Sequence, residues 1–169
     1  MIDEIDEAAL TAGAAAYGLS PEGLNLYRRN NPGSSAGDIL AQIVTDWYFF
    51  IPAVRLAEAR EKAGATTWAY RFDRPLPKDN DGFGSAHAVE IPFVFDTIKD
   101  PEIANLAGVA PSQSVADSTH AVWVRFLTHG DPGWAPYTGG TRTTGILTET
   151  VTTVDDPDGD ERASWDGVL

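Results

Sequence analysis

The feature that most constrains this 169-residue chain is a strand with few candidate partners. The segment TTWAYRFD, residues 66–73, alternates aromatic residues with Thr, Ala and Arg in the way a half-buried β-strand does. Late in the chain, the Thr- and Val-rich stretch TRTTGILTETVTTVDD, residues 141–156, predicts one further strand. A lone strand cannot satisfy the hydrogen-bonding groups on its edges or bury both of its faces. The sequence therefore predicts an α/β fold with an incomplete sheet.

Helical patterns occupy most of the remaining chain. Apolar residues from Ile39 onwards recur at helical spacing, which predicts a helix starting near residue 36, kinked or broken at Pro52, and ending at Gly64. A second long helix is expected within residues 112–130, because Val115, Val122, Phe126 and Leu127 mark one apolar face and Gly130 follows. One or two short helices, separated at Gly18 and capped by Ser20-Pro21, are expected before residue 31.

Composition and charge disfavour several classes of function. The formal net charge is −13 and no Lys/Arg cluster exceeds YRR at 27–29, which disfavours nucleic acid and anionic membranes as partners. The acidic runs MIDEIDE and DDPDGDE are expected to be solvated surface. There is no cysteine, hence no disulfide, thiolate nucleophile or Cys-based zinc site. The start lacks a basic region followed by an apolar one, and no apolar run has the length of a membrane span, so the cytoplasm is the favoured compartment.

Ser35 is the first candidate nucleophile, because GSSAG at 33–37 fits the G-x-S-x-G pattern of a serine hydrolase elbow. An elbow requires a buried strand directly before the serine, and the preceding NLYRRNNP is polar and ends in proline. A Gly-Ser-Ser run before a helix is typical of a helix N-cap, and Asp38 three residues later completes a capping box. The interpretation as a cap is favoured.

His87 is the second candidate. It lies in GSAHAVEIPFVF, residues 84–95, which otherwise has the pattern of an apolar strand, and it directly follows the long Pro/Gly-rich loop RPLPKDNDGFGSA at 74–86. A histidine at such a position can act as a general base, although a histidine satisfied by backbone groups is the simpler alternative. His120 and His129 have the pattern of ordinary helix positions.

Metal sites are not predicted. The order Asp79, Asp81, Gly84, Glu90 superficially fits a calcium loop, but Phe83 occupies a ligand position and no helix precedes the loop. His87 and Glu90 form a His-x-x-Glu pair, which is too small a set for a transition metal without further ligands. No metal and no cofactor is assigned.

Residues 84–95 resemble the segment that carries the catalytic histidine in type-B carboxylesterases, the α/β-hydrolase family that includes the cholinesterases. The matching positions are Gly84, His87, Glu90, Pro92, Val94 and Phe95. Three neighbouring segments agree in order: VTDWYFFIPAVRLAEA with the family's Thr-Asp-x-x-Phe-x-x-Pro helix, TWAYRFD with its eighth strand, and VWVRFLTHGDPGWAPY with its C-terminal helix. TRTTGILTETVTTVDDP resembles the closing β segment, so the similarity runs from about residue 35 to the end.

This resemblance implies a serine esterase mechanism in which His87 is the general base. In the family, the elbow serine, the oxyanion segment and the acid lie upstream of the part that this chain resembles. Glu4 and Glu7 do not sit in the family's setting for the acid, so the acid stays unassigned. The resemblance therefore implies residues 1–169 as one incomplete domain, the C-terminal part of an α/β-hydrolase.

We accordingly expect a carboxylic-ester hydrolase segment that supplies His87 and acts on a small carboxylic ester only when an N-terminal segment completes it. Two alternatives remain open at this point: a non-catalytic binding module that retains the same part of the fold, and a small autonomous esterase that uses Ser35. Self-association through an exposed sheet edge is also expected.

Overall fold

The computed structural model describes residues 4–73, 87–107 and 111–168, and these divide into two compact units. The helical unit comprises Met1–Ala63 and Asp158–Leu169, and the sheet unit comprises Gly64–Pro157. Each unit is described by itself below. The long loop at 74–86 expected from the sequence lies outside the described residues.

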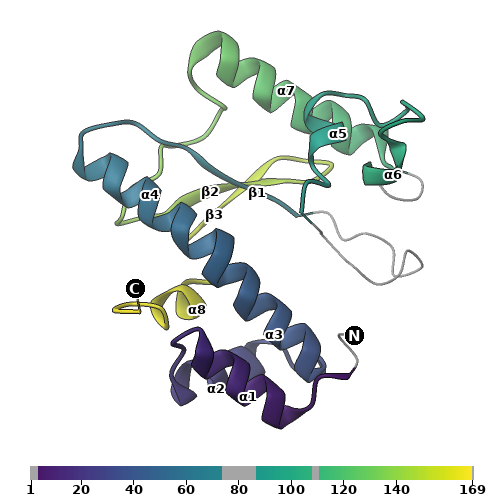
Figure 1. Ribbon diagram of the computed structural model, residues 1–169. Helices are drawn as coiled ribbons and strands as arrows, with labels where there is room; N and C mark the ends of the chain where they lie inside the picture. Colours follow the sequence, from purple (N-terminus) through teal and green to yellow (C-terminus); the bar gives the residue numbers. More distant parts are fainter. Residues whose placement is uncertain (1–3, 74–86, 108–110, 169) are drawn as a thin grey trace. The chain divides into compact units, whose positions relative to one another are not determined.

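The helical unit begins with two short helices, α1 (Glu7–Ala16) and α2 (Pro21–Asn30) (Figure 1). Gly18 lies between them with φ +86°, and Ser20 caps α2 by accepting a hydrogen bond from the Gly23 N–H. The backbone at Gly18 turns in the left-handed region, where glycine is least strained. The predicted pair of helices and its cap are therefore confirmed.

The third helix confirms the predicted start and end, and of the predicted kink or break at Pro52 the break is ruled out. It begins as α3 (Ala36–Thr45), widens into a π-helical turn (Asp46–Phe50) and continues as α4 (Ile51–Lys62), with Gly64 at φ +75° after its end. Pro52 lies in the first turn of α4. Its ring would crowd a carbonyl one turn earlier in a regular helix, and the wider π turn makes room for it without interrupting the helix.

The stretch Ala36–Lys62 is long and apolar enough to cross a membrane by length and composition alone, so the expectation that no run has the length of a membrane span was wrong on those two measures. Here two charged residues tie the stretch to its own unit: Asp46 accepts a hydrogen bond from Tyr27 of α2, and Arg55 donates to the carbonyl oxygens of Trp165 and Val168.

The acidic C-terminal segment is not wholly solvated, so that expectation was wrong. It forms α8 (Gly159–Ala163), Trp165 is buried in the core of the helical unit, and Glu161 is only 3% exposed. The Glu161 carboxylate accepts hydrogen bonds from Asn30, Asn31 and Gln42, at 2.7–3.3 Å. A buried carboxylate needs such donors, and here α2 and α3 supply them.

A second set of hydrogen-bonded side chains lies in the same core. The Trp165 Nε1–H donates to the Tyr27 hydroxyl at 2.8 Å, and that hydroxyl donates to Asp46 Oδ2 at 2.5 Å. Burial raises the pKa of Asp46 to about 6, with smaller contributions of the same sign from Glu161 and Asp158. Burial, and then the Asp46 carboxylate, raise the pKa of Tyr27 well above its usual range.

The described residues of the sheet unit form three strands in the order β1, β2, β3 (Figure 1). β1 (Ala69–Phe72) runs parallel to β2 (Thr143–Leu147) with Ala69 opposite Thr144, and β3 (Thr152–Asp155) runs antiparallel to β2 with Thr143 opposite Asp155. The predicted strand at 66–73 is thus confirmed in shorter form. The single late strand is instead a hairpin, because residues 148–151 turn the chain back.

The described part of this unit also contains α5 (Ile91–Val94), α6 (Ala104–Ala107) and α7 (Gln113–His129). The end of α7 is as predicted, since Gly130 follows in the left-handed region at φ +68°. Val115 of α7 is buried in one apolar cluster with Phe93 of α5. Leu127, which was assigned to the same apolar face as Val115, is 76% exposed.

A close approach between a glycine and an indole fixes the position of β2. A Cβ atom added at Gly145 would lie 2.5 Å from Trp134 Cζ2, well inside van der Waals contact. The Trp68 Nε1–H in turn donates to the Trp134 carbonyl at 3.0 Å. Only glycine at position 145 lets this indole rest on the strand.

We predict that Gly145→Ala lowers the free energy of unfolding by about 2 kcal/mol or more, because overpacking forces the indole off β2. Urea unfolding followed by tryptophan fluorescence measures the change. Gly140→Ala is the matched control, since its nearest atom, Thr138 Oγ1, would be 3.7 Å from the new Cβ. Equal stability of the parent and Gly145→Ala would contradict this packing.

We also predict a pH dependence that originates at Asp46. Its folded pKa of about 6 exceeds the usual 3.8, so the folded state binds this proton more tightly than the unfolded state does. The resulting stability is fully present below about pH 4 and is lost as the pH rises through 6. Asp46→Asn should remove this loss and raise the free energy of unfolding at pH 7 by about 1–2 kcal/mol.

Melting temperatures between pH 4 and 8 check this expectation. Glu22→Gln removes an exposed carboxylate from the first turn of α2 and should leave the pH profile of the parent unchanged. A profile for Asp46→Asn that parallels the parent across the whole range would refute the assignment.

Candidate functional site

His87 is exposed and begins a turn, residues 87–90, that leads directly into α5. The turn is closed by a hydrogen bond from the Ile91 N–H to the Ala88 carbonyl at 3.2 Å. Residues 91–94 form a helical turn with Pro92 as its second residue, so the interpretation of this run as an apolar strand was wrong. Proline fits the first turn of a helix, where its missing N–H is not needed.

The residue after His87 holds an unusual backbone conformation. Ala88 has φ +69°, in the left-handed region that residues with a Cβ seldom adopt. Strain of this kind costs on the order of 1 kcal/mol and persists only where the surroundings hold it. Here Val89 is buried and α5 follows at once, and the two together fix the direction in which the chain leaves His87.

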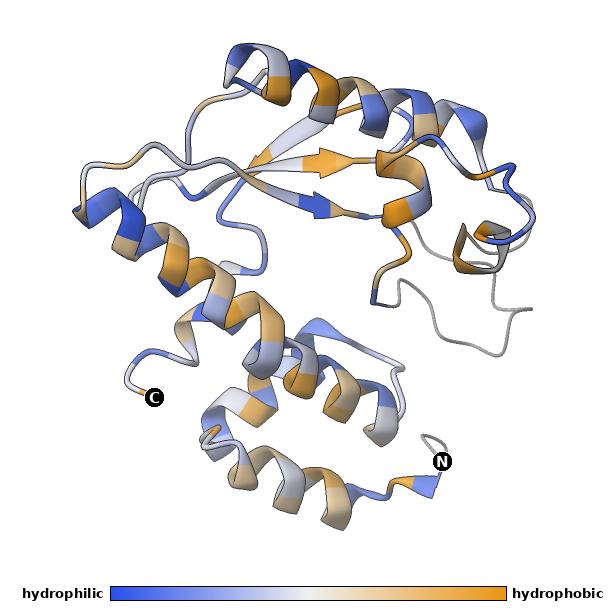
Figure 2. Cartoon of the chain, turned by 45° about the horizontal axis from the view of Figure 1, so that its top comes forward, coloured by the Kyte–Doolittle hydropathy of each residue, from blue (hydrophilic) through white to orange (hydrophobic). Residues whose placement is uncertain are grey.

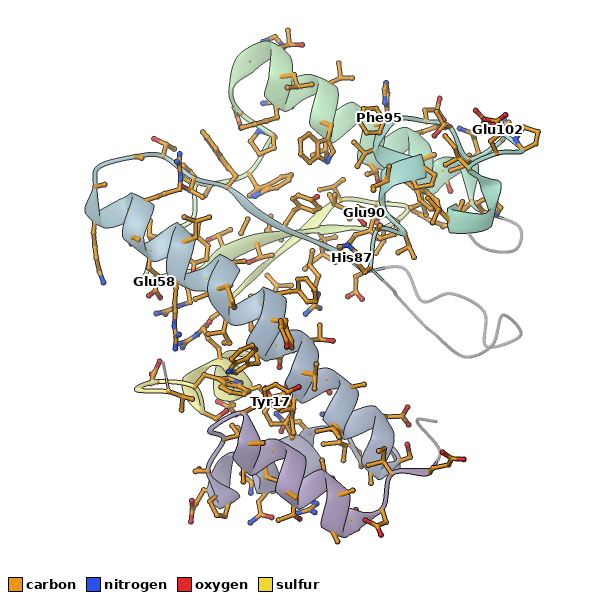
Figure 3. The ribbon with its side chains drawn as sticks, in the orientation of Figure 1. Tyr17, Glu58, His87, Glu90, Phe95 and Glu102 are labelled. Atoms are coloured by element: carbon orange, nitrogen blue, oxygen red, sulfur yellow. The ribbon has the colours of Figure 1, made fainter. Side chains whose placement is uncertain are left out.

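Glu90 lies on the same turn as His87, as the labelled side chains in Figure 3 show. It is partly buried and borders a groove of about 400 Å³ between α5, α7 and β1. Burial, and then the Glu90 carboxylate, raise the pKa of Tyr70, which lines the same groove. The structure thus adds Tyr70 to the neighbourhood of the His-x-x-Glu pair.

His120 is a groove residue that the sequence did not single out. Its Nδ1 lies 2.9 Å from the Val94 carbonyl oxygen, so Nδ1 carries the proton and donates it. In the neutral ring this leaves Nε2 as an acceptor beside the groove. Helical spacing alone gave no signal for this role, because Val94 lies on a different element.

Ser35 is the N-cap of α3, as predicted. Its hydroxyl oxygen accepts a hydrogen bond from the Asp38 N–H at 3.1 Å and lies 2.8 Å from Asp38 Oδ2, while the Ser35 N–H donates to the same carboxylate. The element before it is helix α2 followed by a turn, where an elbow would have a strand. Ser35 belongs to the helical unit, whereas His87 belongs to the sheet unit.

The remaining sequence candidates contribute little to a site. Glu7 pairs with Arg28, and Glu4 is exposed. Asp79, Asp81 and Gly84 lie outside the described residues. No group of three or more potential metal-ligating His, Asp or Glu side chains occurs in the part of the chain that the structure describes.

Comparison with known proteins identifies the family. Residues 16–155 match the profile of the carboxylesterase family, a range that includes Ser35 and His87. The chain is 33% identical to the para-nitrobenzyl esterase of Bacillus subtilis over 130 residues, which is 71% of this chain and 25% of that esterase. It is 26% identical to the phenmedipham hydrolase of Pseudarthrobacter oxydans over 111 residues, 59% of this chain and 21% of the hydrolase.

Solved structures agree with the sequence comparison. A Geobacillus stearothermophilus carboxylesterase crystallised at pH 6.2 superposes with a TM-score of 0.75 at 29% identity, over 93% of this chain and 34% of that enzyme. A para-nitrobenzyl esterase structure gives a TM-score of 0.70 at 27% identity, over 95% of this chain and 33% of the esterase.

The chain therefore spans about a fifth to a third of the relatives that it matches. The helices and the mixed three-stranded sheet are a part of the α/β-hydrolase fold that these enzymes share, which confirms the fold class predicted from the sequence. With the match extending over residues 16–155, the chain belongs to the carboxylesterase family.

Proposed function

We propose that this chain supplies the general-base histidine, His87, to a serine-type carboxylic-ester hydrolase whose nucleophile, acid and oxyanion amides come from further polypeptide. The observation that supports it most is the position of His87: exposed, at the start of a turn fixed by Ala88 and Val89, within the range that matches the carboxylesterase family. Both curated relatives are named for the hydrolysis of small organic substrates.

In the proposed reaction, His87 accepts the hydroxyl proton of a serine as that oxygen attacks the ester carbonyl. The imidazolium then returns the proton to the leaving alcohol, and the same ring activates water to release the acid. An exposed imidazole on a rigid turn can perform these transfers once a serine is within hydrogen-bond reach. A small carboxylic ester is the proposed substrate class.

Ser35 is a poor candidate for that serine. Its hydroxyl is engaged with Asp38 in the capping box, and no strand precedes it to hold it on a strained turn. A small autonomous esterase built on Ser35 is therefore not favoured. The remaining alternative is a binding module that retains the fold without catalysis.

The decisive experiment joins this chain covalently to the other segments of a related esterase. In a chimera, the chain replaces the aligned segment of the Bacillus subtilis para-nitrobenzyl esterase, and hydrolysis of p-nitrophenyl acetate is measured. We expect activity that His87→Ala lowers by about a thousandfold or more, since loss of the base leaves the nucleophile unactivated. His129→Asn, at an exposed position in the last turn of α7, serves as the control and should retain most of the rate.

Two results separate the alternatives. A folded but inactive chimera would favour the binding module. The isolated chain is expected to show no rate above buffer, so a clear rate that both Ser35→Ala and His87→Ala abolish would establish the autonomous esterase and contradict the proposal. Ser35→Ala should in any case lower the free energy of unfolding by about 1 kcal/mol through loss of the cap.

A further inference from the structure

The helical unit is assembled from two stretches of the chain, residues 1–63 and 158–169, and the whole sheet unit lies between them in the sequence. We call residues 158–168, which include α8, the α8 segment. The chain has no cysteine, so no disulfide joins this segment to the helices α1 to α4. Non-covalent contacts alone therefore hold it in place.

These contacts form a specific binding site. Trp165 is 1% exposed, and its Nε1–H donates to the Tyr27 hydroxyl at 2.8 Å. Glu161 accepts a hydrogen bond from Gln42 at 2.7 Å, and Arg55 donates to the Trp165 carbonyl at 3.2 Å. Figure 2 shows hydrophobic residues along α3 and the start of α4, which help to form the core that the indole enters.

The chain that links the sheet unit to the α8 segment is bent against its local preferences. Asp156 has φ +46° and Asp158 has φ +55°, in the left-handed region where a Cβ atom crowds the backbone. Pro157 lies between them, and a residue that precedes proline prefers an extended backbone. We call residues 156–158 the hinge. It holds two residues in conformations that they disfavour.

Asp158 also occupies the N-cap position of α8 without capping it. An N-cap residue normally has an extended backbone, and its side-chain oxygen accepts a hydrogen bond from the first turn of the helix. Here the backbone is left-handed, and the side chain makes no cap hydrogen bond to α8, all of whose residues the structure describes. An extended hinge allows Asp158 to adopt the usual N-cap conformation.

Extension of the hinge carries the α8 segment away from its own helices and makes it available to a second copy. Every contact of the segment can form again in that copy, so the closed and exchanged forms differ at the hinge and in the entropy of association. The closed form benefits from the effective concentration of a linked segment, which is about millimolar for a short linker. Strain in a short hinge opposes the closed form, and a dimer relieves it twice.

We propose that two copies of this chain exchange their α8 segments. In the resulting dimer, Trp165 and Glu161 of each copy occupy the site that α2, α3 and α4 of the other copy form. The partner is therefore a second copy of this chain, which contributes buried residues to each helical unit. This inference goes beyond the proposed function and is independent of it, because the exchange does not involve His87.

Disulfide trapping tests the exchange, since the chain has no cysteine of its own. A Cβ atom added at Gly23 would lie 3.4 Å from the Ser164 Cβ, close to the roughly 3.5–4.5 Å usual in disulfides. Its closest contact, Leu19 Cδ1 at 2.7 Å, is the end of a flexible side chain. Chains with Gly23→Cys alone and chains with Ser164→Cys alone are unfolded in urea and refolded together, at high concentration, with oxidised glutathione. Mass spectrometry should find a cross-link between two chains that joins positions 23 and 164.

Two controls accompany this measurement. One chain with both substitutions, refolded at low concentration, should form the cross-link within itself. Ser114→Cys is the matched control for Ser164→Cys, because Ser114 is an exposed serine on α7 in the sheet unit. Its cross-link to Gly23→Cys should be at least about tenfold weaker. Equal yields, or a cross-link within one chain but never between two, would overturn the exchange.

A second experiment tests the hinge without a cross-link. Asp158→Gly and Asp158→Val remove the same carboxylate, but glycine is unstrained at a φ of +55° whereas the β-branched valine is strongly strained. Light scattering after refolding at several concentrations should give Asp158→Val a dimer association constant about tenfold or more above that of Asp158→Gly. Equal constants would contradict the role of the hinge. A dimer without the link between positions 23 and 164 would show association through another surface, such as the sheet edge, and would overturn the proposal.

Discussion

The parallel pairing of β1 with β2 is the interaction on which the sheet unit depends. It joins two segments that lie more than 70 positions apart, from Ala69 opposite Thr144 to Phe72 opposite Leu147. The chain between these strands must therefore cross over the sheet, and it carries the turn of His87, α5 and α7 on the way. Trp134, resting on Gly145, then fixes β2 in place. The pairing register of β1 and β2 is set by residues far apart in the sequence. It therefore determines where the segment that carries His87 lies.

The same constraint accounts for what the unit leaves exposed. A parallel pair of strands is stable inside a larger sheet whose faces are covered. Here β1 is the terminal strand among the described residues, and the groove between α5, α7 and β1 is lined mostly by apolar side chains. In the helical unit, buried polar side chains have hydrogen-bond partners within one core, as for Tyr27, Asp46, Trp165 and Glu161. The open strand edge and the apolar groove therefore both belong to the sheet unit, which carries the proposed base His87.

Structural features that depend on residues nearby in the chain could be predicted from the sequence. Ser20 and Ser35 as helix caps and Gly130 as a helix end follow from backbone groups a few residues away. The burial of Glu161 could not be predicted, because its donors Asn30 and Gln42 lie more than 100 residues earlier. The strand pattern at 84–95 was misleading for a similar reason: Pro92 lies in a helical turn, and Phe93 next to it packs against Val115 and Ala116 of α7.

The central claim is that this chain brings the base while the serine lies elsewhere. The most direct measurement is mass spectrometry after treatment with an organophosphate that labels activated serines. In the chimera, the account predicts an adduct on a serine outside these 169 residues, formed only when His87 is present, and no adduct on the isolated chain. An adduct on Ser35 of the isolated chain would contradict the account.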